Sequence, residues 1–311
     1  MKYILSILLF ISTQLFAQQA TPPAIFSTGS QGLTYNQMAS ELVRSCQSTS
    51  ATKWHVAASS GSEENVDCIL NNKCNLSIVQ ADVLTVLAQG NGNVRVFQSL
   101  HPEEVHLIVL SQVKKVGGVM GIGAKTIPFN ESLDLEKQKV GVWGGSVITA
   151  NIINDKSGSD FIVVEFNDQK SALAALDKRD IDAILTVGGS RIKWIEGLDQ
   201  TYKLIPFSDD HIKSLSKVYN VAKVSYRNLR QNNVKTISVP AVIITRNYTT
   251  GNVYKALVEL KACFADKLKD LESTAGNHAK WADVKLPGMD DYAEPKWPMW
   301  EAVPTKATVK K

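Results

Sequence analysis

The sequence predicts an α/β protein built from two similar lobes that form a clamp. Expected strands and helices alternate along the chain, which is typical of parallel sheets with crossover helices. This alternation runs through two cycles, and each contains a strand, a Gly-Ser loop and a helix in that order. After the second cycle a long apolar stretch, VKTISVPAVIITRN, leads into a strong helical pattern, VYKALVELKACFADKLKDL. The chain is therefore expected to return to the first lobe, leaving at least two strands that cross between the lobes.

The first cycle begins with a short strand at Ala24–Ser27 and an amphipathic helix at Tyr35–Cys46. A strand at KWHVAAS, a capped helix at SGSEENVDCILNN and a strand at LSIVQAD follow. EEVHLIVLS then reads as a longer apolar strand. Ligand sites on open α/β sheets lie at the carboxyl ends of strands, so the loops that follow these strands are the candidate binding loops.

The second cycle starts near Ser132 and repeats this order. SLDLEKQKVGVW becomes a strand, GGSVITANIINDKSG is a Gly loop with a helix, and DFIVVEF is a strand. A helix follows with Asn167 or Asp168 as its cap, and IDAILTVGG is a strand that runs into a Gly pair. The Gly-rich stretch between the cycles, SQVKKVGGVMGIGAKTIPF, is expected to be a hairpin near the hinge or a mobile loop.

The N-terminus is typical of a secretory signal peptide. Lys2 precedes an apolar region from Tyr3 to Ile11, and the small residue Ala17 precedes Gln18. We expect residues 1–17 to be removed after Ala17, with no cysteine at the cut to carry a lipid. No other run is apolar and long enough to span a bilayer. The mature chain is therefore expected to be a soluble, exported and most plausibly periplasmic protein.

The charge pattern argues against nucleic acid as a partner. Lys and Arg number 34 and Asp and Glu 30, which gives a net charge of +4, and loss of Lys2 leaves +3. These charges are spread along the chain, with no basic arm and no helix-turn-helix signature.

The four cysteines stand at positions 46, 68, 74 and 263, and four cysteines allow three pairings. An exported protein meets oxidising conditions. The spacing in DCILNNKCNL favours a local disulfide between Cys68 and Cys74, which would leave Cys46 to pair with Cys263. The alternative is that some of these residues are buried free thiols. The spacing does not match the usual zinc motifs.

The opening loop, in IFSTGSQGLTYNQMASELV, is the first candidate site. Gly29 and Gly32 let the backbone approach a ligand closely. The N–H groups at the start of the next helix favour a carboxylate or phosphate, and Ser30, Thr34 and Tyr35 add hydroxyl groups. The loop is neither a Walker A loop nor a GxGxxG loop, and the alternative is an ordinary capped turn.

A second loop in the first lobe, ASSGSEEN, repeats this theme. Ser60 and Gly61 are candidate ligand contacts, while Ser62 reads better as a plain helix cap. Gln80 ends a strand, where its amide could bind a polar ligand; the alternative there is a helix cap, with Asp82 the better candidate for that role.

Two loops of the second lobe complete the candidate site. VWGGSVIT offers Trp143, Gly145, Ser146 and Thr149. TVGGSRIKW offers Gly188, Gly189 and Arg191. An arginine binds a carboxylate through two parallel hydrogen bonds, so Arg191 would be a strong anchor if it faced the cleft. The alternative is a solvated surface arginine.

Catalytic patterns are missing from the sequence. The five histidines are scattered, with no HExxH motif, and no G-x-S-x-G elbow is present. LHPEEVHL holds His101, His106 and two glutamates, but this spacing does not suit a helix face and His106 falls in an apolar strand. We interpret this segment as structural. No enzyme activity, cofactor or metal is expected.

Six segments in the same order resemble the TAXI family of solute receptors for TRAP (tripartite ATP-independent periplasmic) transporters. These are FSTGSQGLTYNQMASELV, GSEENVDCILNNKCNLSIVQADV, LHPEEVHLIV, SLDLEKQKVGV, IDAILTVGG and NNVKTISVPAVIITR. The resemblance covers most of the mature chain, to about Asp270, and implies the two-lobed type 2 periplasmic binding protein fold. It also implies a receptor that captures a small organic anion, such as glutamate or a di- or keto-acid, for a membrane-embedded TRAP permease driven by an ion gradient.

By this resemblance the opening loop at 29–35 would hold the carboxylate of the solute. The expected first lobe spans 24–111 plus 237–295, the second lobe spans 112–236, and residues 296–311 form a tail. The alternative function is an exported protein that uses the same clamp outside transport, as a sensor input or an interaction protein.

Overall fold

The structure is a computed structural model that describes residues 23–46, 52–112, 129–286 and 297–302, together with the backbone of 114–116 and 125–127. The predicted signal peptide at 1–17 lies outside the described residues. Over the described ranges, no helix is both long enough and apolar enough to cross a membrane.

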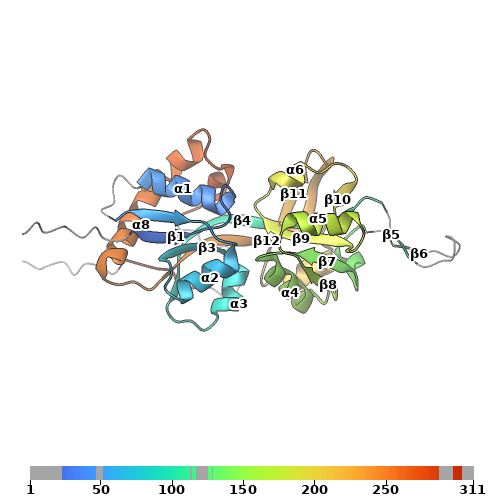
Figure 1. Ribbon diagram of the computed structural model, residues 1–311, viewed down its shortest axis with the longest axis horizontal. Helices are drawn as coiled ribbons and strands as arrows, with labels where there is room; N and C mark the ends of the chain where they lie inside the picture. The colour runs from blue at the N-terminus through green and yellow to red at the C-terminus, as the bar shows by residue number, and fades with distance from the viewer. Residues whose placement is uncertain are drawn as a thin grey trace, which may run out of the picture.

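The two-lobed α/β architecture is present, with one ten-stranded sheet running through both lobes (Figure 1). The main strand order is β2-β1-β3-β12-β4-β9-β7-β8, with β10 paired to β4 and β11 paired to β12. The elements of the first lobe are β1 (Ala24–Ser27), α1 (Thr34–Cys46), β2 (Trp54–Ala57), α2 (Ser62–Leu70), β3 (Leu76–Gln80), α3 (Ala81–Ala88), α8 (Gly251–Ser273) and the 3-10 helix η2 (Ala279–Asp283).

The second lobe contains the strands and helices between the two crossing strands. Its elements are η1 (Ser132–Leu135), β7 (Lys139–Val142), α4 (Ser146–Ser157), β8 (Ile162–Glu165), α5 (Gln169–Asp177), β9 (Ala183–Gly188), α6 (Lys193–Glu196), β10 (Tyr202–Leu204), α7 (Asp209–Leu215) and β11 (Asn220–Tyr226). Within the Gly-rich segment, the described residues form an antiparallel pair of short strands, β5 (Lys114–Val116) and β6 (Lys125–Ile127). This pair lies at the outer end of the second lobe, away from the strands that join the lobes (Figure 1).

Two long strands connect the lobes, β4 (Val94–Leu110) and β12 (Gln231–Arg246). At the crossing Pro102 lies opposite Pro240, and the register of the ladder shifts directly after Pro240. Proline has no N–H to donate, so the ladder is interrupted where the lobes meet. The part of β4 that pairs with β9 in the second lobe begins at Glu104, so the chain crosses between the lobes earlier than residue 111.

Helices cover both faces of the sheet in each lobe, which produces four apolar clusters. In the first lobe, Leu42 of α1 and Leu257 of α8 belong to one buried cluster, while Val66 of α2 and Val83 of α3 belong to another on the opposite face. In the second lobe α4 and α7 pack on one face, and α5 and α6 pack on the other. The described part of the C-terminal tail belongs to the first lobe, because Trp300 is fully buried in the cluster with Leu42.

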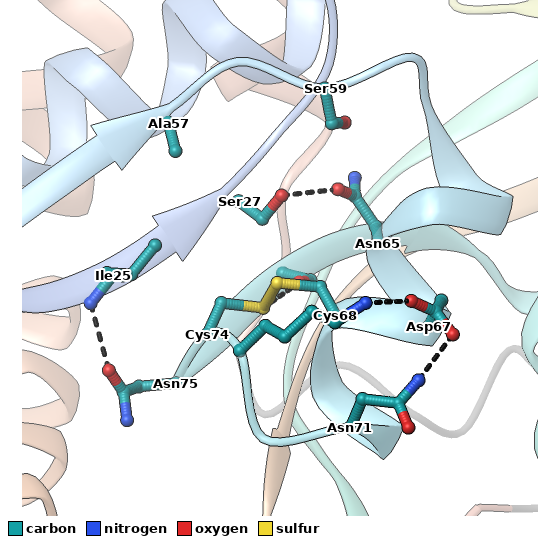
Figure 2. Close-up of a disulfide and its surroundings, with 12 residues drawn as sticks. Ile25, Ser27, Ala57, Ser59, Asn65, Asp67, Cys68, Asn71, Cys74 and Asn75 are labelled. Carbon is teal, nitrogen blue, oxygen red and sulfur yellow. Dashed lines mark hydrogen bonds and ion pairs between the residues drawn. A yellow bond between two sulfur atoms is a disulfide. The ribbon is translucent and has the colours of Figure 1, made fainter.

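Both disulfides considered from the sequence are present. Cys68 bonds Cys74 with a Cα–Cα distance of 5.5 Å, joining the end of α2 to the loop before β3 (Figure 2). Cys46 bonds Cys263 with a Cα–Cα distance of 5.8 Å, tying α1 to α8. The described cysteines include no free thiol, so that alternative is not realised.

The helix caps differ in one place from the sequence interpretation. Asp168 caps α5 and accepts a hydrogen bond from the backbone N–H of Ser171 at 2.8 Å, as expected. Ser62 does not cap α2: the N-cap is Gly61, and the Ser62 hydroxyl accepts a 3.0 Å hydrogen bond from the Gln80 N–H instead. The plain-cap interpretation of Ser62 was therefore wrong, because the hydroxyl is used to join α2 to the end of β3.

Candidate functional site

The two binding loops predicted in the first lobe lie side by side. The backbone N–H of Ser59 donates to the carbonyl of Gly29 at 3.2 Å, and the Ser59 hydroxyl donates to the carbonyl of Thr28 at 3.2 Å. Ser30 and Gly32 are exposed, and Gly32 has a φ of 77°, which favours glycine. Thr34 is half-buried at the first position of α1. The opening loop is thus open to solvent at its tip and fixed at its base.

An internal carboxylate already occupies the donors of Ser60 in the second loop. The backbone N–H and the hydroxyl of Ser60 both donate to Oε2 of Glu64, at 2.8 and 2.7 Å. These hydrogen bonds hold the pKa of Glu64 below its usual value. The predicted anion-binding geometry is present at Ser60, where the anion is a side chain of the protein itself, whereas the N–H of Gly61 donates to the Ser59 hydroxyl at 3.2 Å.

The predicted loop at 143–149 meets the first lobe directly. A Cβ atom added to Gly145 would clash with Oε1 of Gln80, so the two lobes are in close contact at this glycine. The Thr149 hydroxyl donates to the carboxyl of Asp82 in α3 at 2.7 Å. Gln80, Gly145 and Thr149 are therefore brought together at the boundary between the lobes.

Two residues of the same loop face their own lobe. The Ser146 hydroxyl is buried and accepts a 3.1 Å hydrogen bond from the backbone N–H of Val187. The Trp143 ring packs against Trp194, with ring centroids 6.0 Å apart. Both contacts position the loop rather than place a polar group between the lobes.

The Gly188–Arg191 segment contributes glycines to the boundary but not the arginine side chain. Gly188 pairs with Glu104 of β4, and a Cβ on Gly189 would lie 2.6 Å from Cε of Lys280. Arg191 is exposed and has a φ of 70°. Its role as a carboxylate anchor stays a prediction, and its exposure favours the alternative of a solvated arginine.

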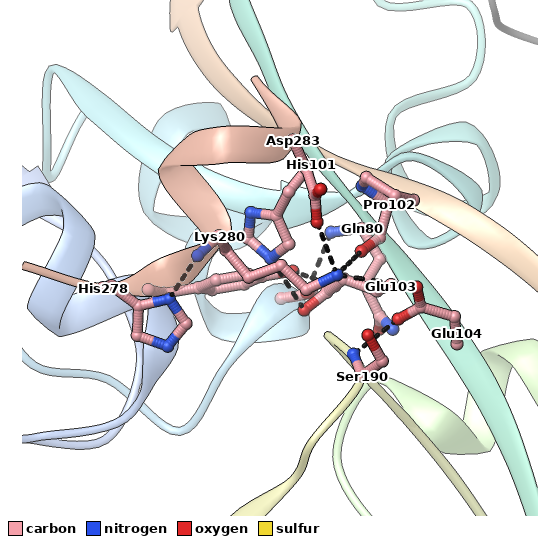
Figure 3. A network of polar contacts seen from close by, with 11 residues as sticks. Gln80, His101, Pro102, Glu103, Glu104, Ser190, His278, Lys280 and Asp283 are labelled. Atoms are coloured by element: carbon pink, nitrogen blue, oxygen red, sulfur yellow. Dashed lines mark hydrogen bonds and ion pairs between the residues drawn. The ribbon is translucent and has the colours of Figure 1, made fainter. Parts of the chain in front are cut away.

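Among the described residues, Lys280 of the 3-10 helix η2 is a cation that does lie between the lobes (Figure 3). Its side chain is only 7% exposed, and its Nζ lies 2.9 Å from Asp283 and 3.5 Å from Glu104. Glu104 also accepts a 2.6 Å hydrogen bond from the backbone N–H of Ser190 in the second lobe. Burial raises the pKa of Glu104, and the charge of Lys280 opposes this shift.

A second polar group on β4 lies beside this ion pair. Glu103 is 5% exposed and its Oε2 accepts a 2.5 Å hydrogen bond from the hydroxyl of Tyr35. Burial, and then the charge of Glu103, hold the pKa of Tyr35 well above its usual value. Tyr35 is thus a predicted site residue that the fold brings against a carboxylate of the crossing strand.

His101 completes the cluster on the crossing strand (Figure 3). Its ring is fully buried, and neither ring nitrogen has a hydrogen-bond partner among the residues that the structure describes. Nε2 lies 3.8 Å from Oε1 of Glu103, which is too long for a hydrogen bond. Buried polar groups in folded proteins are nearly always paired, so His101 marks a place where a partner is missing.

Sequence reasoning missed the roles of His101, Glu103, Glu104 and Lys280. The first three stand in LHPEEVHL, which was interpreted as a structural strand, and Lys280 lies beyond the segments that carried the family resemblance. The available signal was the pair of adjacent glutamates inside an otherwise apolar strand. Within the described ranges, no group of three potential metal-ligating side chains comes together.

The fold defines a class of protein: two α/β lobes joined by crossing strands, the type 2 periplasmic binding protein fold. An ancestral arginine-binding protein bound to arginine has a similar structure, with a TM-score of 0.50 and 12% identity over 81% of this chain and 94% of that one. A protein of Archaeoglobus fulgidus has a TM-score of 0.50 and 11% identity over 86% of this chain and 83% of its own. The GluR0 ligand-binding core in complex with L-glutamate has a TM-score of 0.49 and 11% identity, covering 80% and 95%.

The family model of the NMT1-like family matches residues 26–286, so this chain belongs to that family. No curated protein sequence matches the chain significantly. The identities to the solved structures are low, and that likeness therefore bears on the fold alone.

Proposed function

We propose that this protein is an exported, periplasmic solute receptor that closes its two lobes on a small organic acid. The observation that carries the proposal is the buried polar cluster at the strand crossing, where Tyr35, His101, Glu103 and Lys280 from the first lobe meet the second lobe at Gly189 and Ser190. Clefts between domains are a preferred place for small-molecule sites. Hinged closure around a ligand is the usual response of such a clamp.

The proposed solute is an amino acid such as glutamate, or a di- or keto-acid. The opening loop at 29–35 would hold one carboxylate through its N–H groups and hydroxyls, since its tip is exposed and its base is fixed. Lys280 would supply the fixed cation, in place of the exposed Arg191. Water screens the charge of a buried ammonium group only weakly, so this charge attracts a nearby carboxylate strongly.

The proposed partner is a membrane-embedded TRAP permease, to which the closed receptor would deliver the solute. This part rests on the sequence resemblance to TAXI receptors, and membership of the NMT1-like family is compatible with it. Binding without catalysis fits the candidate site, in which buried polar groups contact one another across the lobes.

A thermal-shift screen of amino acids, dicarboxylates and keto acids tests the binding function. A ligand at a hundredfold excess over its Kd stabilises the folded state by about 2.7 kcal/mol, which is readily measured. We expect at least one acid to raise the melting temperature, and Lys280→Ala to lose that shift while the exposed-site control Lys269→Ala keeps it. A flat response across the library, with protein shown to carry no co-purified ligand, would contradict the proposal.

A further inference from the structure

The proposed site contains more buried acidic groups than buried cations. Glu103, Glu104 and Asp82 are all less than 9% exposed, and among the described lysines and arginines only Lys280 is buried. Lys280 faces Glu104 and Asp283, with distances of 3.5 and 2.9 Å. Among the described residues, the ion-pair partner found within 4.0 Å of Glu103 is His101. No lysine or arginine of the described ranges therefore pairs with Glu103, and its carboxyl can take a positive group from a ligand.

Three hydrogen-bond acceptors converge at Glu103. Its Oε2 is used by the Tyr35 hydroxyl, which leaves Oε1 available, and the Tyr35 oxygen can itself accept. The third is a ring nitrogen of His101, because a neutral imidazole offers one acceptor nitrogen and neither nitrogen of this ring has a partner among the described residues. An ammonium group has three N–H donors and no acceptor, so its donors match these three groups in number and kind.

The distance between His101 and Glu103 suits a bridging nitrogen. Nε2 and Oε1 are 3.8 Å apart, beyond direct hydrogen bonding. A nitrogen placed about 2.9 Å from both atoms would form an ordinary hydrogen bond to each. The other ring nitrogen of His101 would still carry a proton, and a carboxylate oxygen of the same solute or a water can accept it.

We infer that Tyr35, His101 and Glu103 form an ammonium subsite, and that the solute is a 2-amino acid rather than a keto acid or a simple dicarboxylate. This inference rests on the proposed function, because it assigns one end of the same site. The opening loop and Lys280 take the carboxylate, and the ammonium subsite takes the amino group. Glu103 discriminates because a keto or methylene group cannot donate to it, which leaves the buried carboxylate unpaired.

Calorimetry with matched pairs of ligands tests the ammonium subsite. The pairs are glutamate with 2-oxoglutarate, leucine with 4-methyl-2-oxopentanoate, and alanine with pyruvate, and the members of each pair differ at the 2-amino or 2-oxo group. We expect any pair that binds to favour its amino member at least tenfold. In Glu103→Gln the preference should fall to less than threefold, whereas the exposed control Glu272→Gln should keep it.

The outcomes separate this inference from the proposed function. Binding of a keto member within threefold of its amino partner in wild-type protein would overturn the subsite and leave an acid receptor in place; a water or a direct His101–Glu103 ion pair would then explain the geometry. Binding of putrescine but of no acid would support the ammonium subsite and overturn the acid-receptor proposal. No binding by any acid or by putrescine would contradict both. The wild-type comparison needs no variant, so a folding defect in Glu103→Gln cannot obscure the result.

Discussion

The hydroxyl of Thr149 in the second lobe donates a 2.7 Å hydrogen bond to the fully buried carboxyl of Asp82 in the first lobe. The hydroxyl of Tyr219, also from the second lobe, donates to the same oxygen at 2.9 Å. Burial raises the pKa of Asp82, and these two hydrogen bonds oppose the shift. Both donors come from the second lobe, so this contact helps to hold the two lobes together.

Replacing Thr149 by Val should weaken solute binding without greatly changing the stability of the free protein. The substitution removes a hydrogen bond to a charged acceptor, worth about 1.5–3 kcal/mol, from the closed state. That loss corresponds to roughly a tenfold or larger increase in Kd, measured by calorimetry with the solute found in the screen. Thr236→Val is the matched control, because Thr236 is equally buried but donates to Val105 on a neighbouring strand. An unchanged Kd in Thr149→Val would show that Asp82 does not help to hold the lobes closed.

Glu41 should contribute strongly to the stability of the segment that carries Lys280. Its carboxyl accepts hydrogen bonds from the indole N–H of Trp281 at 2.6 Å and from the backbone N–H of His278 at 3.0 Å. Glu41→Ala leaves the buried indole donor of Trp281 and the half-buried N–H of His278 unpaired, which costs about 2–5 kcal/mol of unfolding free energy, measured in urea. The exposed control Glu272→Ala should change it by less than about 0.5 kcal/mol. A small effect at Glu41 would mean that η2 is held mainly by apolar packing.

The two disulfides should contribute unequally to stability. The Cys46–Cys263 bond closes a sequence separation of 217 residues, and the Cys68–Cys74 bond one of 6. On the loop-entropy model, removing the long-range bond costs about 5 kcal/mol and removing the local bond about 2 kcal/mol. Pairwise Cys→Ser variants, unfolded in guanidinium, measure both values. Equal losses, or a larger loss for the local pair, would contradict this order, and non-reducing peptide mapping would contradict the pairing itself if it found other partners.

His106 should make the protein less stable in mild acid. Its ring is fully buried, with Nε2 2.9 Å from the Tyr226 hydroxyl, and burial lowers the pKa of His106 from 6.5 to about 4. The unfolded chain therefore binds the proton first, so this contribution is complete above pH 6.5 and is lost as the pH falls toward 4. The loss between pH 7 and pH 5 is about 2 kcal/mol.

The comparison of wild type with His106→Gln isolates this titration from other groups. Burial lowers the pKa of His211 and His278 as well, and raises the pKa of Asp82 and Glu104, which acts in the opposite direction. These contributions remain in the variant and cancel in the difference between the two curves. Parallel curves of unfolding free energy against pH would contradict the assignment to His106.

Local sequence signals predicted the elements well because they depend on neighbours in the chain. The expected helix at Tyr35–Cys46 is α1, which begins one residue earlier, and the expected strand at Ala24–Ser27 is β1. The return of the chain to the first lobe through β12 and α8 was also predicted, from the length of the apolar stretch and the helix after it.

The residues that meet at the site come from segments far apart in the sequence, and local sequence patterns do not predict such contacts. Tyr35 meets Glu103 because α1 packs beside the crossing of β4 and β12. Lys280 reaches Glu104 only because η2 folds back against β4, across a separation of 176 residues. Arg191 follows a glycine pair, which made it the better candidate from the sequence. The backbone at Arg191 has a positive φ, however, and the residue is exposed.

Native mass spectrometry of protein purified without refolding tests the central claim most directly. The account predicts a fraction of molecules carrying one small adduct, which is released on denaturation and identified as a 2-amino acid. The same solute, added back to stripped protein, should restore the adduct with a stoichiometry of one per chain. Two results together would contradict the account of this chain as a solute receptor. The purified protein would carry no adduct, and it would take up no organic acid or amine when these are added.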